Sequence, residues 1–73
     1  MKIKQITNYK GRFCALMENG KYVVNNGSFE LAVCEKVDDG LKVIKTGIVG
    51  GKMMRTEEDF RFCVEITDWS KIM

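Results

Sequence analysis

Histidine is absent from this sequence of 73 residues, and its three cysteines, Cys14, Cys34 and Cys63, are widely spaced with no CxxC pair. Zinc sites are built from cysteine and histidine ligands at short, regular spacings, so the pattern does not fit a zinc site. An odd number of distant cysteines also fails to supply a full disulfide framework. We expect each thiol to be a small apolar group, buried or half-buried, and we expect neither a metal ion nor another cofactor.

The lack of histidine also removes the side chain that most often transfers protons near neutral pH. No cysteine has an activating partner that is evident from the sequence. Adjacent carboxylates occur at Asp38-Asp39 and Glu57-Glu58, but both pairs lie beside turn signals, and neighbouring residues of a strand point to opposite faces. The sequence therefore predicts no catalytic residue, and we expect a protein that is not an enzyme.

Long apolar runs are missing as well. No run approaches the roughly 20 residues that a membrane-spanning helix needs, and the opening segment, residues 1–4, lacks the apolar core of a signal peptide. We therefore expect a cytoplasmic protein in a reducing compartment, without a membrane partner.

Charge of one sign is in small excess: twelve lysines and arginines against ten aspartates and glutamates give a net charge of +2. This excess is too small to indicate nucleic-acid binding by composition alone. The distribution is uneven, because residues 1–12 hold four cations and no acid, whereas residues 57–68 hold five acids and one arginine. Opposite charges favour placing these segments side by side, as paired strands or across a subunit contact.

The length and the hydrophobic fraction of 45% indicate one folded domain over residues 1–73. A chain of this size is near the limit at which one core outweighs the entropy of ordering it. Self-association buries further surface, so we expect a homo-oligomer, with a dimer favoured.

Glycine-containing dipeptides typical of tight turns divide the chain. They are Asn19-Gly20, Asn26-Gly27 and Asp39-Gly40. The first separates residues 12–18 from 21–25, and the last separates residues 28–37 from 41–46, which predicts two β-hairpins.

Alternation of apolar and polar residues predicts the strands. It is clearest over residues 60–66, where the apolar positions are Phe60, Phe62, Val64 and Ile66. Residues 29–34 repeat the pattern, with Phe29, Leu31 and Val33 on the expected core face. Residues 12–18 are apolar on both faces, as expected of a strand covered on both sides. Residues 2–6 give a weaker signal, because Ile3 is out of phase with Ile6.

Helix is restricted to short segments, because glycines and turn dipeptides interrupt the longer windows. Thr56 is a candidate N-cap for a single turn over the acidic residues 57–59. The fold class is therefore all-β or β-rich: a small barrel or a strongly bent antiparallel sheet of five to six strands, with at most one or two short helical turns.

Several large apolar residues lie in segments that do not alternate, and such residues suit adaptable contact surfaces. They are Met53, Met54, Trp69, Ile72 and Met73. Alternatively, they plug the open ends of a small barrel. We expect a non-enzymatic binding protein, an interaction module or inhibitor-like protein of a kind common in phages and mobile elements, that contacts a protein partner through these residues or an exposed sheet edge.

The alternative function is binding of nucleic acid or a phosphorylated nucleotide, because small β-barrels bind such ligands on basic, aromatic strips. The candidate residues are Lys2, Lys4, Tyr9, Lys10 and Arg12, together with Gly50, Gly51 and Lys52 of the glycine loop over residues 47–52. The loop does not match a P-loop, which has four residues between its first glycine and a Gly-Lys pair that Ser or Thr follows. Here Gly47 lies too close to the Gly51-Lys52 pair, and Met53 follows Lys52. A bulge or a sharp bend is the simpler interpretation of Gly50 and Gly51.

Overall fold

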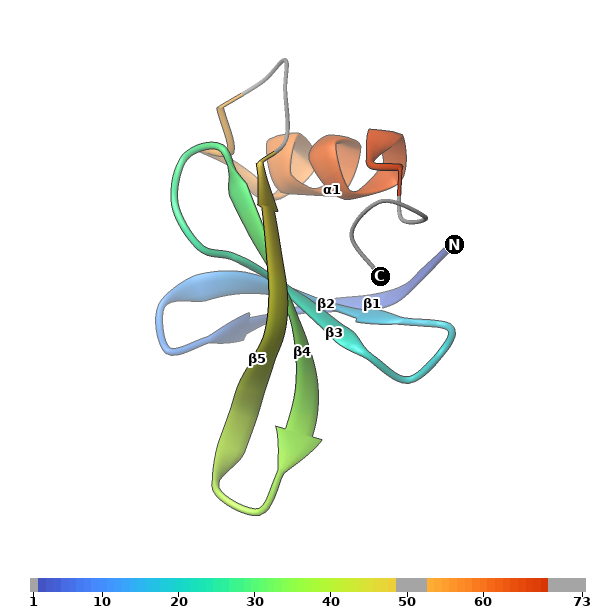
Figure 1. The fold of residues 1–73 in the computed structure, drawn as a ribbon. Coiled ribbons are helices and arrows are strands. Elements are labelled where there is room, and N and C mark those ends of the chain that lie inside the picture. Colours follow the sequence, from blue (N-terminus) through green and yellow to red (C-terminus); the bar gives the residue numbers. More distant parts are fainter. Residues whose placement is uncertain (1, 49–52, 69–73) are drawn as a thin grey trace.

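The computed structural model describes residues 2–48 and 53–68. Five antiparallel strands form one sheet in sequential order, and a single helix follows them (Figure 1). The elements are β1 (Ile3–Tyr9), β2 (Arg12–Met17), β3 (Tyr22–Asn25), β4 (Glu30–Val37), β5 (Gly40–Ile48) and α1 (Glu57–Ile66). The expected β-rich class with a strongly bent antiparallel sheet is confirmed. The alternative of a closed barrel is not, because the described parts of β1 and β5 do not pair with each other.

Both predicted hairpins are present, at Asn19-Gly20 between β2 and β3 and at Asp39-Gly40 between β4 and β5. A third hairpin joins β1 to β2 through Lys10 and Gly11, whose φ angles of 52° and 81° match a type I′ turn. The predicted tight turn at Asn26-Gly27 is instead part of a longer connection over residues 26–29, which the Asn26 amide closes by donating to the Glu30 carbonyl at 2.8 Å.

The strand predicted over residues 60–66 is wrong, because these residues lie in α1. Thr56 caps the helix as expected: its hydroxyl oxygen accepts a hydrogen bond from the Asp59 amide at 3.1 Å. The helix then continues for ten residues, beyond the single turn predicted. Its buried residues, Phe60, Cys63 and Val64, follow helical i, i+3, i+4 spacing. Phe62 and Ile66, which the alternation assigned to the core, are each 49% exposed.

The main core lies between α1 and one face of the sheet. Phe60 stacks on Phe13 of β2 with ring centroids 5.7 Å apart. The cluster contains Ala15, Met17, Val23, Leu31, Met54, Phe60, Cys63 and Val64. Leu31 and Val33 are buried as predicted, whereas Phe29 precedes β4 and is 43% exposed.

A β-bulge explains the mismatched phase of Ile3 and Ile6. Ile3 pairs with Met17 and Ile6 with Ala15, and the extra residue is Lys4. The bulge shifts the alternation by one residue, so both isoleucines pack against the main core. The break in the alternation of apolar residues over residues 2–6 therefore corresponds to the β-bulge in β1.

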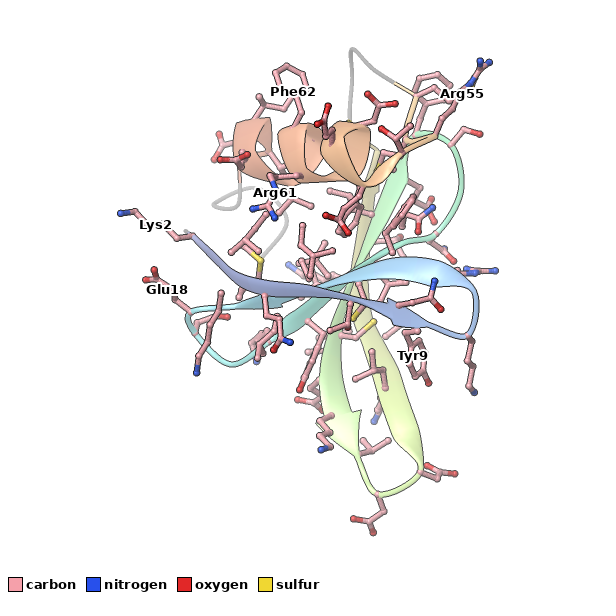
Figure 2. The ribbon with its side chains drawn as sticks, turned by 180° about the vertical axis from the view of Figure 1, so that it is seen from behind. Lys2, Tyr9, Glu18, Arg55, Arg61 and Phe62 are labelled. Atoms are coloured by element: carbon pink, nitrogen blue, oxygen red, sulfur yellow. The ribbon has the colours of Figure 1, made fainter. Side chains whose placement is uncertain are left out.

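Of the four cations in residues 1–12, which the charge distribution placed beside the acidic segment, Lys2 lies next to α1. Lys2 and Ile3 line a hollow together with Arg61 and Glu65 of α1, and Figure 2 shows Arg61 beneath α1, on the same side of the molecule as Lys2. The contact joins a strand to a helix and is not the predicted strand pair. Among the described helical residues, none form a helix long and apolar enough to cross a membrane.

Candidate binding groove

The face of the sheet opposite α1, which we call the open face, carries a second apolar cluster. Its buried members are Cys14, Val24, Ala32 and Cys34, and partly buried Tyr9, Tyr22 and Leu41 pack against them. These residues alternate along the strands with those of the main core. Because the buried members are small and the surrounding ones large, the face has a low floor between higher walls.

Tyr9 connects the two edge strands across this face. Its hydroxyl oxygen accepts a hydrogen bond from the Leu41 amide of β5 at 3.1 Å, and Figure 2 shows Tyr9 at the end of β1, directed toward the β4–β5 hairpin. Gly40 permits this approach, because a Cβ atom at that position would lie 2.6 Å from the Tyr9 hydroxyl. One side chain therefore links strands that a closed barrel would join by backbone pairing.

A hollow of about 290 Å³ lies beside this bridge. We call it the groove. It is lined by Tyr9, Lys10, Arg12, Val24, Asn26, Ala32, Cys34, Leu41 and Val43. A second hollow of about 210 Å³ also includes Tyr9 and Leu41 in its lining and extends toward Lys36 and Asp38. Because the two hollows share these residues, the Tyr9–Leu41 bridge forms a wall between them.

Two cations stand at the groove, and the structure holds each in place. The Lys10 ammonium lies 5.3 Å from the centre of the Tyr9 ring, within the range of a cation–π contact. The Arg12 guanidinium donates a hydrogen bond to the side-chain oxygen of Asn26 at 2.8 Å. Asn26 in turn donates to the Glu30 carboxylate at 2.6 Å. The groove therefore combines an apolar floor with two positioned positive charges.

Cys14 and Cys34, the two cysteines of the apolar cluster on the open face, are poor nucleophiles at neutral pH. Burial raises the pKa of the Cys14 thiol, and a hydrogen bond with Thr7 opposes that shift in part. Burial also raises the pKa of Cys34, and interaction with Cys14 adds to the shift. All three cysteines are buried, as the sequence predicted. Both floor thiols stay protonated at neutral pH and act as apolar surface.

The edge strands beside the open face are protected against pairing with another chain. Within the described residues β1 and β5 each pair with one strand only. The bulge in β1 falls at Lys4, and the register of β5 shifts at Ile44, which Lys45 follows. Bulges and lysines on edge strands hinder edge-to-edge association. The open face is therefore a better candidate for contact than either edge.

The apolar residues predicted to bind a partner are placed only in part. Met54 is 6% exposed and belongs to the main core, where its amide donates to the Ser28 carbonyl at 3.0 Å. Met54 is therefore a core residue and is not part of an exposed contact surface. Met53 is half-buried, and its sulfur accepts a hydrogen bond from Arg55. The predictions at Trp69, Ile72 and Met73 lie outside the described residues.

The predicted basic strip divides into two parts. Tyr9, Lys10 and Arg12 meet at the groove, whereas Lys2 lies at the opposite end of β1, beside α1. Lys4 is exposed at the bulge of β1. The predictions at Gly50, Gly51 and Lys52 lie outside the described residues.

The sequence analysis missed the floor of the groove and its wall on β5. Alternation placed Ala32 and Cys34 on the side away from the core; Cys34 was still expected to be buried as a thiol, whereas the burial of Ala32, which is 2% exposed, was not predicted. A signal was present, because these positions of β4 hold small apolar residues where a solvated strand face carries polar ones. Leu41 and Val43 gave no comparable signal, since their placement depends on how far the sheet bends.

No cluster of three or more metal-ligating side chains occurs in the described ranges. Comparison with known families, curated proteins and solved structures found no match to this chain.

Proposed function

We propose that this protein is a small, non-enzymatic binding protein that contacts a protein partner through the groove. The observation that supports this proposal most directly is the exposure of Val43, 52%, at the rim of a hollow whose floor is apolar. Apolar surface bordered by polar residues is typical of partner sites, and small pockets beside aromatic side chains receive the anchor residues of protein interfaces.

The dimensions of the groove also favour a protein partner. A volume of about 290 Å³ lies just below the range for small-molecule sites, roughly 300 to 1,000 Å³. The groove is wide enough for one large side chain, and the surrounding sheet surface would contact the rest of a protein. Self-association, expected from the short chain, remains a prediction that sedimentation velocity tests.

The proposal is tested by co-purification from the cells that produce the protein, followed by reconstitution with the identified partner in purified form. Val43→Asp places a carboxylate at the rim of the groove, and we expect the partner to be lost. Phe29→Asp is the matched control, since Phe29 is a similarly exposed apolar residue that does not line the groove. Retention of the purified partner by the Val43→Asp protein at full affinity would show that the groove is not the site.

Nucleic-acid binding is the second candidate, because Tyr9, Lys10 and Arg12 converge on one hollow. Two contacts argue against stacking of a base on Tyr9. The Lys10 ammonium lies over the Tyr9 ring, and the Leu41 amide donates a hydrogen bond to the Tyr9 hydroxyl. Phosphate binding weakens steeply with salt, whereas an apolar interface changes little. Titration of a single-stranded oligonucleotide at low and moderate salt separates the two candidates.

A further inference from the structure

We infer that the groove recognises an acidic segment of its protein partner in which one large apolar side chain is flanked by carboxylates. This inference rests on the proposed function and specifies the chemistry of the partner. The apolar side chain contacts the exposed Val43 and the half-buried Leu41 above the floor, and the two cations at the groove receive the carboxylates.

The first argument is the composition of the floor. Val24, Ala32 and Cys34 present apolar side chains, and the backbone beneath them is paired within the sheet through the β3–β4 and β4–β5 ladders. A nucleobase seated there would leave the polar atoms of its edge without partners, which is unfavourable in a desolvated site. An apolar side chain has no such requirement.

The second argument is charge. The lining of the groove includes Lys10 and Arg12 and no acidic residue. Arg12 donates to the neutral amide of Asn26, which in turn donates to the Glu30 carboxylate, and Lys10 lies over the neutral ring of Tyr9. These contacts position both cations without a direct carboxylate partner at the groove. A guanidinium held in this way is suited to a carboxylate, with which it forms charge-assisted hydrogen bonds.

The test uses three short peptides with blocked termini. The first is Glu-Asp-Phe-Asp-Glu, the second replaces its acids by the corresponding amides, and the third replaces phenylalanine by glycine. Each is titrated into the ¹⁵N-labelled protein, and NMR shifts report both weak affinity and location. We expect the first peptide to shift the amides of Ala32, Leu41 and Val43, and each altered peptide to bind at least about tenfold more weakly.

Two double variants of equal charge change locate the binding. Lys10→Gln with Arg12→Gln removes the groove cations, and we expect at least about a tenfold loss of affinity. Lys42→Gln with Lys45→Gln is the control. Leu41 and Val43 face the groove, so Lys42 between them points to the other face of the sheet. Lys45 pairs with Val33, which alternates with the groove residues Ala32 and Cys34, so Lys45 also points away from the groove. The control should bind the peptide as the unaltered protein does.

Equal binding of the amide peptide, shifts confined to α1, or no binding of any peptide would overturn the acidic-segment inference. Tighter, cation-dependent binding of a single-stranded oligonucleotide than of the acidic peptide would overturn it in favour of nucleic acid. Failure of the proposed function is distinguishable. If the peptides fail but Val43→Asp still releases the purified native partner, only the acidic class is wrong. If Val43→Asp retains that partner, the groove assignment itself is wrong, whatever the peptides do.

Discussion

The hydroxyl group of Tyr9 has a structural effect out of proportion to its size, because it joins the ends of an open sheet. It accepts the Leu41 amide hydrogen on the edge strand β5, where no sixth strand of the described chain supplies an acceptor. The shape of the groove depends on this single bond, since Tyr9 and Leu41 both line it.

Replacing Tyr9 by phenylalanine should lower the free energy of unfolding by about 1 kcal/mol, the net contribution of a typical hydrogen bond. Urea denaturation measures the change. Tyr22→Phe is the matched control on the same face, because the Tyr22 hydroxyl forms no hydrogen bond within the described part of the chain. Equal losses for the two variants would show that the bond to Leu41 does not stabilise the fold.

Gly40 is required for the same bridge. Its φ of 152° is unfavourable for other residues, and an added Cβ would meet the Tyr9 hydroxyl at 2.6 Å. We expect Gly40→Ala to destabilise the protein by about 1 to 3 kcal/mol. In a Tyr9→Phe background the loss should be smaller, because the colliding oxygen is gone. An identical loss in both backgrounds, measured by denaturation, would mean that the backbone angle alone accounts for it.

The floor thiols predict a decline of stability at alkaline pH. Because burial raises the pKa of Cys14 and Cys34 in the folded protein, both states are fully protonated below the ordinary thiol pKa of about 8.5. Above that pH the unfolded chain loses these protons first, so unfolding becomes more favourable as pH rises toward the folded-state pKa. The Cys14→Ala and Cys34→Ala double variant should show a shallower decline in urea denaturation between pH 7 and 10. An equally steep decline would assign the effect to other groups.

At the scale of elements, α1 shows where sequence periodicity is ambiguous. Phe60 and Val64 are four residues apart, a spacing that both an alternating strand and one face of a helix contain. The capping residue resolves the ambiguity, because Thr56 satisfies the Asp59 amide and three acids occupy the first turn. The sequence analysis recognised the cap but limited its effect to one turn.

Removing the cap should therefore weaken the whole packed element. We expect Thr56→Ala to lower the free energy of unfolding by about 1 kcal/mol, because α1 contributes Phe60, Cys63 and Val64 to the main core. Thr56→Ser retains the capping oxygen and serves as the control in the same denaturation experiment. Equal destabilisation by alanine and serine would indicate that the methyl group, and not the cap, is responsible.

The hairpins were easier to predict than the helix, because their turns depend on local backbone conformation. Asn19-Gly20 and Asp39-Gly40 place glycine at positive φ, and the sequence shows this requirement directly. The Lys10-Gly11 turn has no asparagine at its first position, and its support comes from the Asn8 side chain, which accepts from the Gly11 amide at 3.0 Å. A search for turn dipeptides does not detect a hydrogen bond from a side chain outside the dipeptide.

At the scale of the molecule, the sheet has an apolar cluster on each face but only one short helix in the described chain to cover them. β2 and β4 are buried on both sides, as predicted for the segment 12–18, yet α1 covers only one face (Figure 1). The other face is shielded by the bend of the sheet and by Tyr9, Tyr22 and Leu41. Tyr9, Lys10 and Arg12 were identified from sequence as one candidate site, but their meeting with Val24, Ala32 and Val43 depends on bending, which no local pattern encodes.

Hydrogen–deuterium exchange of the protein, alone and in complex with its purified partner, tests the central claim that the groove is the contact surface. We predict slower exchange in the complex over residues 9–14, 30–34 and 41–43, which contain the groove-lining residues of β1, β2, β4 and β5, and unchanged exchange over α1. Protection confined to residues 57–66, with the groove strands exchanging as they do in the free protein, would contradict the account.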